Sequence, residues 1–313
     1  MSKTLKILSR PKGNAEEYGR WSVNAYLGCS HNCSYCYLKK GPGAKTLGGC
    51  EPKLKKNVID REHAQLLALV EIKENEEQIR KDGGLFMSFT TDPCLPETIG
   101  LFSDINIYAQ MRRKLPVTIL TKCAYMEESK CPGIPTRPFY CTFCITRELL
   151  AIGWTLTGHD ELEPNAAPNE ERIRYMKMAS EDGFKTWASI EPVIDFPSAL
   201  AMVYQAVNAG CGHFKIGLLT NNTRLVRKDF AFGEHKFKAY DVIDCLHFIE
   251  DVMRLIDGRA TVYWKQSVRD LLGTIYSPAA VDELLDYPHS VGKDWNMFQK
   301  VRTETDTKIE RTD

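Results

Sequence analysis

Short apolar runs alternate with longer amphipathic stretches along most of the chain. Continuous apolar runs predict buried strands at 21–27, 85–90, 116–121, 152–157, 184–190 and 213–219. Amphipathic stretches predict helices at 60–81, 99–114, 169–181, 197–209 and 239–256, with Asn169 as an N-cap and Gly183 as a stop. Strands that are apolar throughout suit a sheet covered on both faces. Six strand–helix units in a row therefore favour a parallel α/β barrel or sheet.

The remaining segments divide the chain into three parts. Residues 1–20 form a polar N-terminal lead-in, and 21–258 form the strand–helix core, in which 39–58 is a long loop. Residues 259–313 form a C-terminal extension with a possible strand at 260–264, a short helix near 278–286 and a charged tail.

Composition narrows the class of protein. The 313 residues are 43% hydrophobic, which is enough for a sizeable core, and Lys+Arg and Asp+Glu number 41 each. Nucleic acid is thus neither favoured nor excluded as a partner. No apolar run approaches the ~20 residues of a membrane span, and the first residues lack a signal-peptide core, so we expect a cytoplasmic protein. Eleven cysteines in such a chain suit reduced thiols and metal ligation.

Three of these cysteines, Cys29, Cys33 and Cys36, have a C-x3-C-x2-C spacing within eight residues. Soft thiolates at this density favour an iron–sulfur cluster, zinc or copper(I). Because a [4Fe–4S] cluster takes four ligands, three cysteines leave one iron for another molecule. The alternative is a zinc site that pairs Cys33 and Cys36 with Cys141 and Cys144. Those pairs lie 104 residues apart, whereas zinc-binding pairs usually lie within ~15–20 residues.

A second group of cysteines lies between the third and fourth predicted strands. Its members are Cys123, Cys131, Cys141 and Cys144. Four cysteines in 22 residues could bind zinc or an auxiliary cluster. The alternative is reduced thiols packed beneath a loop, since free cysteine is commonly buried.

The three-cysteine motif, with an aromatic residue before its last cysteine, resembles the signature of the radical S-adenosylmethionine (SAM) superfamily. Other stretches resemble its spore photoproduct lyase-like (DNA repair photolyase-like) branch. In family order they are Asn24-x-Tyr26-x-Gly28-Cys29, Pro52-x-Leu54-Lys55-x-Asn57, Ser88-Phe-Thr-Thr-Asp92-Pro93, Leu120-Thr121-Lys122, Leu162-Glu163-Pro164 with Pro168 and Glu171-Arg172-Ile173, and Ile190-Glu-Pro-Val-Ile194. The resemblance implies an incomplete (β/α)6 TIM-type barrel of the radical SAM type, with a small C-terminal extension.

The resemblance also implies a set of residues that bind SAM beside the cluster. Tyr35 would lie against the adenine, and Thr91 would offer its hydroxyl to the SAM head group. Lys122 would meet the methionine carboxylate as a point cation. Thr155 and Thr157 flank the position of a hydroxyl that contacts ribose or carboxylate, and either could fill it. Strand-end threonines are otherwise ordinary cap or turn residues.

Other polar residues are less informative. Asp92 and Glu191 are candidates for ligand contacts, or shape turns together with the prolines that follow them. We expect His31 to be an exposed loop residue, with a hydrogen bond that tunes the cluster as the alternative. His159 lies at a strand end on the same rim, and its sequence context favours no specific role.

The function implied by the resemblance is reductive cleavage of SAM to a 5′-deoxyadenosyl radical that abstracts hydrogen from a substrate. The resemblance implies an electron donor such as flavodoxin or ferredoxin as a partner. The branch that the chain resembles suggests nucleic acid as the substrate. The alternatives are modification of a peptide or small metabolite, or an iron–sulfur binding module without SAM cleavage. Spore photoproduct lyase itself has a hydrogen-donating cysteine where this chain has Phe89, so we expect a different reaction. Cys94 is the alternative thiol.

Overall fold

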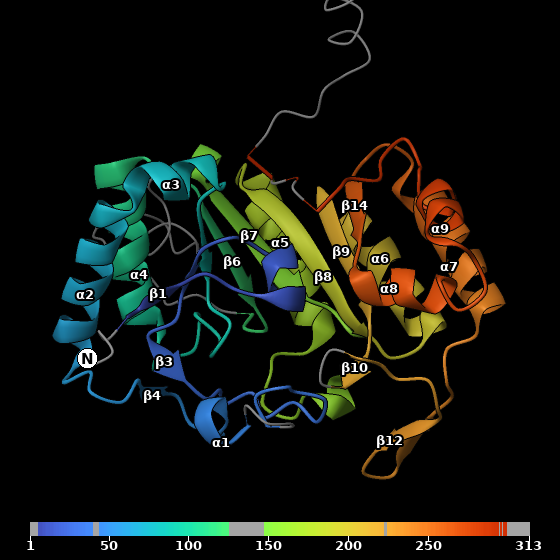
Figure 1. Cartoon of the computed structure of the whole chain (residues 1–313), viewed down its shortest axis with the longest axis horizontal. Helices are drawn as coiled ribbons and strands as arrows, with labels where there is room; N and C mark the ends of the chain where they lie inside the picture. Colours follow the sequence, from blue (N-terminus) through green and yellow to red (C-terminus); the bar gives the residue numbers. More distant parts are fainter. Residues whose placement is uncertain are drawn as a thin grey trace, which may run out of the picture.

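The computed structural model describes residues 6–39, 44–124, 147–221, 224–293, 295 and 297–298. Its main sheet contains, in spatial order, β1 (Leu8–Ser9), β2 (Ser22–Val23), β5 (Leu85–Met87), β6 (Val117–Thr121), β7 (Leu150–Thr155), β8 (Lys185–Val193), β9 (His213–Leu218) and β14 (Thr261–Trp264). β1 is antiparallel to β2, and every later pair is parallel (Figure 1). The predicted alternation of strands and helices in an α/β fold is therefore confirmed.

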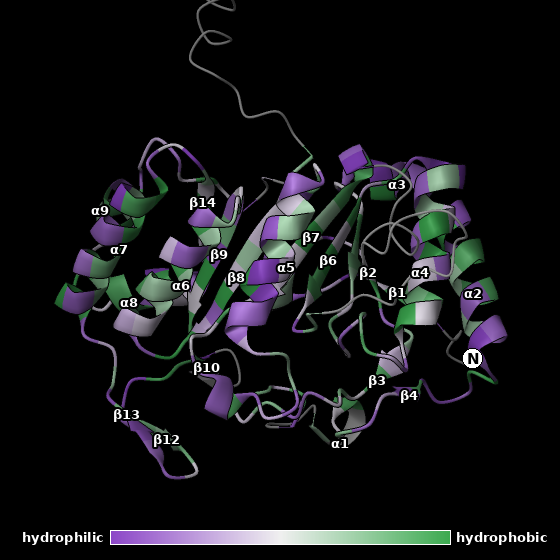
Figure 2. Cartoon of the chain, turned by 180° about the vertical axis from the view of Figure 1, so that it is seen from behind, coloured by the Kyte–Doolittle hydropathy of each residue, from purple (hydrophilic) through white to green (hydrophobic). Residues whose placement is uncertain are grey.

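Helices pack on one face of this sheet, as the view from behind shows (Figure 2). The described helices are α1 (Ala44–Leu47), α2 (Arg61–Glu74), α3 (Glu76–Lys81), α4 (Ile99–Ile107), α5 (Asn169–Glu181), α6 (Phe196–Asn208), α7 (Val242–Ile256), α8 (Gln266–Leu272) and α9 (Pro278–Leu284). The helix expected at 60–81 is two helices, because Asn75 interrupts it with a side-chain hydrogen bond to the Glu71 carbonyl (2.8 Å). The stretch expected to continue α4 is instead a π-helical turn, Tyr108–Arg112. The short helix α8 was not predicted.

The strands separate two apolar cores. On β7, Ile152 and Trp154 belong to the large cluster between sheet and helices, whereas Ala151 packs with Trp187 on the opposite, concave face. A Cβ on Gly153 would lie 2.1 Å from Cε2 of Trp187. The concave face thus accommodates the indole because β7 has no side chain at that position.

The N-terminal segment packs into the concave face. Its 3-10 helix η1 (Gly13–Glu17) is followed by Tyr18, whose hydroxyl lies 2.8 Å from that of Ser189 on β8. At the other end of the chain, β14 joins the sheet beside β9. Both terminal parts of the sequence therefore contribute to the central sheet or its interior.

The expected N-cap at Asn169 is wrong. Pro168 precedes the helix, and Asn169 is the first residue of α5. Its amide instead donates to Asp160 (2.6 Å), and its side-chain oxygen accepts the Thr157 N–H (3.1 Å). The side chain therefore bridges the turn after β7 rather than the first turn of its own helix.

A small hairpin stands at the end of the barrel where the parallel strands finish. It consists of β12 (Phe230–Phe232) and β13 (His235–Phe237) and projects beside β10 (Thr220–Asn221), which pairs with β11 (Arg224–Leu225) (Figure 1). A second pair, β3 (Tyr26–Leu27) with β4 (Lys53–Leu54), lies at the same end. Among the described residues, no helix has the length and apolar character needed to cross a membrane.

Candidate active site

The three-cysteine motif lies in a loop of residues 28–37, here called the cysteine loop, directly after β3. Gly28 opens it with φ +89°, and a Cβ there would lie 2.5 Å from the Glu51 carbonyl oxygen. Only glycine suits that backbone and that close approach. Farther along, Ser34 donates its N–H to the Leu162 carbonyl (2.8 Å). Cys29 also donates its N–H to the Gly49 carbonyl (3.1 Å), so the loop is held both to the segment before β4 and to the segment after β7.

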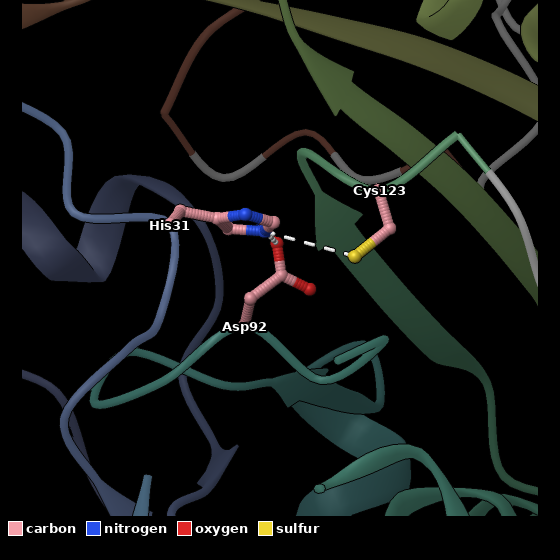
Figure 3. A group of neighbouring side chains, drawn as sticks. All are labelled: His31, Asp92 and Cys123. Atoms are coloured by element: carbon pink, nitrogen blue, oxygen red, sulfur yellow. Dashed lines mark hydrogen bonds and ion pairs between the residues drawn. The ribbon is translucent and has the colours of Figure 1, made fainter. Parts of the chain in front are cut away.

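The side chain of Asp92 ties this loop to two strands. Its Oδ1 accepts hydrogen bonds from the Cys94 N–H (2.9 Å) and the Thr121 hydroxyl (2.8 Å). Its Oδ2 accepts from the Lys122 N–H (2.8 Å) and lies 2.9 Å from His31 Nε2 (Figure 3). Burial opposes ionisation, but His31 and these hydrogen bonds more than offset it and lower the pKa of Asp92.

His31 is buried, with 4% of its surface exposed, so the expectation of an exposed loop residue is wrong. The segment after β7 folds back over the loop and brings the Asn165 carbonyl to 3.2 Å from Nδ1. Nε2 lies 3.7 Å from Cys123 Sγ in addition to its contact with Asp92 (Figure 3). Sequence spacing gives no sign of this enclosure, because Asn165 is 134 residues away.

His31, Asp92 and Cys123 offer ligand atoms within 4.8 Å of one another, a spacing that a metal ion could use. Asp92, however, already has both oxygens engaged in the hydrogen bonds described above, so this group acts as a structural tie. The other members of the second cysteine group lie outside the described residues: Cys131, Cys141 and Cys144. A second metal centre there stays a prediction.

Lys122 and Tyr35 meet beside the cysteine loop. Lys122 Nζ lies 5.6 Å from the centre of the Tyr35 ring, and the Tyr35 hydroxyl donates to Glu163. Glu163 forms a fully buried ion pair with Arg172 (2.6 Å). Arg172 also donates to the Thr155 carbonyl at the end of β7 (2.9 Å). Glu163 and Arg172 lie in the stretches that resemble the radical SAM family, but the sequence did not predict that they form an ion pair.

The electrostatics place a cation next to the thiols. Burial raises the pKa of Cys29 to about 12, and it also raises that of Cys33, while Lys122 acts to lower both. Burial by itself would lower the pKa of Lys122, but Cys33 and Glu163 reverse the direction and raise it. Lys122 therefore remains a cation beside thiols, which are the form of cysteine that loses its proton on binding a metal.

The strand-end threonines differ in what their hydroxyls contact. Thr91 is buried, and its Oγ1 has no hydrogen-bond partner among the described residues. Thr157 Oγ1 accepts the His159 N–H (3.2 Å), which makes it part of a local turn. Thr155 follows Gly153 by two positions, so its side chain faces the concave interior. An orphaned buried hydroxyl at Thr91 is what a site for an additional polar ligand would contain.

Phe89 stands where spore photoproduct lyase has its hydrogen-donating cysteine, and Cys94 is the alternative thiol. Phe89 stacks on Phe86 at 4.5 Å between ring centres, inside the concave face. Cys94 is completely buried, and burial raises its pKa well above the ordinary value. Tyr37 of the cysteine loop donates its hydroxyl to the Phe89 carbonyl. The group that is hydrogen-bonded to the backbone of Phe89 is thus the phenol of Tyr37 and not a thiol.

A charged network fills the interior below the loop. Lys265 Nζ contacts Glu191 Oε2 (2.5 Å) and Glu17 Oε2 (3.2 Å), and only 2% of Lys265 is exposed. The Tyr18 hydroxyl donates to Glu191, and the ammonium of Lys265 lies 4.2 Å from the Tyr18 ring centre. Glu191 was expected to contact a ligand or shape a turn, and the structure adds this ion pair. Glu17, Tyr18 and Lys265 were missed, because their contacts join opposite ends of the chain.

His159 lies on the same rim between two carboxylates. Its Nε2 is 2.6 Å from Asp195 Oδ2, and its Nδ1 is 2.7 Å from Glu161 Oε1. Asp195 caps α6 through the Ser198 N–H (2.8 Å), and the imidazole packs edge-on against Phe237 of the hairpin at 5.3 Å. His159 therefore joins the end of β7 to α6 and to the hairpin.

Known proteins share this architecture at low sequence identity. A structure of spore photoproduct lyase complexed with dinucleoside spore photoproduct matches with a TM-score of 0.58 and 14% identity, covering 84% of this chain and 81% of that chain. A variant of that enzyme with bound AdoMet and dinucleoside spore photoproduct gives 0.57 and 14%, with coverages of 83% and 79%. The expected relationship to spore photoproduct lyase is thereby confirmed at the level of the fold.

Sequence comparison adds one relative. An uncharacterized protein of Methanocaldococcus jannaschii is 24% identical over 182 residues, which are 56% of this chain and 61% of the relative. The match thus spans less than two thirds of that protein. No protein-family model matches the chain.

Because His159 contacts two carboxylates, we expect it to make the free energy of unfolding depend on pH. The hydrogen bond to Asp195 raises the pKa of His159 above 6.5, and Glu161 adds to this although burial opposes it. A raised folded-state pKa stabilises the fold fully below pH 6.5, and this contribution is lost as pH rises through the raised value. We expect His159→Gln to lower the free energy of unfolding at pH 6 and to approach wild type at pH 9.

Urea unfolding at pH 6, 7 and 9 measures this difference. The exposed His247, replaced by Gln, is the control and should show no such trend. A deficit of His159→Gln that stays constant from pH 6 to 9 would contradict the charged pairing.

Proposed function

We propose that the protein is a radical SAM enzyme in which Cys29, Cys33 and Cys36 hold a [4Fe–4S] cluster and the neighbouring strand ends hold SAM. The observation that carries this proposal is the placement of the Lys122 ammonium beside the cysteine loop, in a chain with the fold of spore photoproduct lyase. When bound, the cluster supplies the electron that splits SAM into methionine and a 5′-deoxyadenosyl radical.

The chain's own residues fit this pair of cofactors. Three thiols close in sequence match a cluster that leaves one iron for SAM. Lys122 offers a cation to the methionine carboxylate, and the unpartnered Thr91 hydroxyl offers a hydrogen bond to the same head group. Tyr35, fixed through Glu163, presents its ring to the adenine. The barrel orients these groups and keeps water out.

We assign the fourth-strand hydroxyl to Thr155 rather than Thr157. The side chain of Thr155 faces the barrel interior, whereas that of Thr157 is engaged by the His159 N–H. Arg172 supports this choice, because it holds the Thr155 backbone in place through the carbonyl.

The proposed substrate is a nucleic acid or a part of one. Support comes from the fold, because the matching spore photoproduct lyase structures contain a dinucleoside. A flavodoxin- or ferredoxin-like electron donor and a cytoplasmic location complete the proposal. If binding to DNA and RNA is absent at low salt, a peptide or small metabolite becomes the substrate class instead.

The first test is cluster assembly. We expect anaerobically reconstituted wild type to hold at least one [4Fe–4S] cluster, and the triple change of Cys29, Cys33 and Cys36 to Ala to remove it. Iron and sulfide analysis measures this, and Cys211→Ala, at a buried cysteine just before the amino end of β9, is the control. A triple variant that retains all of its iron would show that the assignment is wrong.

The second test concerns SAM binding. Lys122→Ala should weaken SAM affinity while leaving the iron content unchanged, because it removes a carboxylate partner and not an iron ligand. A charge-assisted hydrogen bond is worth ~1.5–3 kcal/mol, so a loss of roughly ten- to a hundredfold is expected. Lys53→Ala, which removes an exposed cation on β4, is the control. Equal affinities in the three proteins would refute the role of Lys122.

The third test concerns the reaction itself. With Phe89 stacked where a hydrogen-donating thiol would be needed, we expect no repair of DNA that contains 5-thyminyl-5,6-dihydrothymine. Product analysis by mass spectrometry should still detect slow release of 5′-deoxyadenosine. Restoration of thymines over multiple turnovers would overturn this expectation, and loss of that activity in Cys94→Ala would then identify the donor.

A further inference from the structure

A cavity of about 530 Å³ opens at the end of the barrel opposite the cysteine loop. Its wall includes Leu85 and Thr118, which lie at the amino ends of β5 and β6, together with Tyr18, Lys215 and Trp295. Small-molecule sites have volumes of ~300–1,000 Å³, so this cavity is large enough for a ligand. None of the proposed cluster or SAM residues lines it.

Lys215 is a buried cation without a carboxylate in contact. Only 8% of it is exposed, and its ammonium donates to the backbone carbonyl of Glu17. It forms no ion pair with any residue that the structure describes, because Lys265 occupies both interior carboxylates, Glu17 and Glu191. The described residues therefore accept one of the three ammonium hydrogens of Lys215 and leave two for a ligand.

Three aromatic rings surround this ammonium. The ring centres of Tyr18, Trp187 and Tyr263 lie 5.0, 5.9 and 6.0 Å from Lys215 Nζ. Aromatic rings stabilise a buried cation only partly and do not replace a counter-charge.

The wall contains a second unused donor. The indole N–H of Trp295 is buried and has no hydrogen-bond partner among the described residues. The acids at the mouth are engaged, because Asp82 pairs with Arg10 (2.7 Å) and Glu16 pairs with Lys293 (3.2 Å). Besides these two ion pairs, Lys12 and Lys215 line the cavity and form no ion pair with a described residue. Together with the Trp295 N–H, they offer an anion unused donors.

We propose that this cavity binds a small organic dianion, a dicarboxylate or a phosphate monoester, through the Lys215 ammonium and the Trp295 N–H. The ligand supplies the counter-charge that no described residue offers Lys215 in direct contact, and its second anionic group faces Lys12. This site is separate from the proposed SAM chemistry and does not depend on it.

Binding at this site is coupled to a proton. Burial, reinforced by repulsion from Lys265, lowers the pKa of Lys215 to about 7, although Glu17 and Glu191 oppose this. An anion beside the amine raises that pKa, so binding at pH 8 takes up close to one proton. Burial raises the pKa values of Tyr18 and Tyr263, so these phenols keep their protons. His213, whose ring centre lies 4.3 Å from that of Trp295, is also buried, and burial together with Lys215 lowers its pKa well below the ordinary value.

Isothermal titration calorimetry at pH 8 tests the proposal with the reconstituted protein. The probes are succinate for a dicarboxylate and sulfate for a phosphate dianion, because neither titrates near pH 8. Measurements in two buffers of different ionisation enthalpy give the number of protons taken up. We expect saturable binding of one probe with uptake of close to one proton.

The variant Lys215→Met should weaken this binding at least tenfold and abolish the proton uptake, while Trp295→Phe should weaken it severalfold and keep the uptake. Lys177→Met, at an exposed lysine on α5, should behave as wild type. Because methionine avoids the cost of a buried amine, the thermal midpoint of Lys215→Met should not fall. Absence of binding or of proton uptake in wild type, or equal affinity in Lys215→Met, would overturn the proposal.

Discussion

The buried carboxylate of Asp92 is the interaction on which the arrangement of the site depends. It contacts donors from the cysteine loop, from the end of β6 and from its own turn before α4. A buried carboxylate must be hydrogen-bonded, and each group facing it would be left without its partner if it were removed. One oxygen of Asp92, Oδ2, contacts both His31 and the Lys122 N–H. It therefore fixes the position of His31, and with it the cysteine loop, relative to the Lys122 backbone.

A second buried charge works in the same way on the other side of the loop. Glu163 lies between Arg172 and the Tyr35 hydroxyl, and neither Glu163 nor Arg172 is exposed. Such a pair contributes little net stability, since desolvation offsets its attraction. Its effect is geometric, because it fixes the Tyr35 ring and the end of β7 relative to each other. Two ties, each charged, thus hold the loop from opposite sides.

The sequence predicted the features that follow from the pattern of parallel strands. Apolar runs located β5 to β9, and the carboxyl ends of parallel strands meet at one edge, which brings Thr91 and Lys122 to the cysteine loop. The burial of His31 could not be predicted, because it depends on Asn165, which is far away in the chain. The break at Asn75 was missed because helical periodicity continues across it. No spacing rule connects Glu17 with Lys265, 248 residues later.

The interior charges link the two ends of the barrel. Glu17 and Glu191 face two lysines, and both carboxylates contact Lys265 rather than Lys215. Lys265, which lies nearer the cysteine loop, thus pairs with two carboxylates. Lys215, which lies nearer the opposite end of the barrel, pairs with none of the described carboxylates. Burial without a carboxylate in contact favours loss of the Lys215 proton, although Glu17 and Glu191 oppose this, and it also favours the binding of an anion. The two carboxylates that pair with Lys265 therefore leave Lys215, at the other end of the barrel, without a carboxylate in contact.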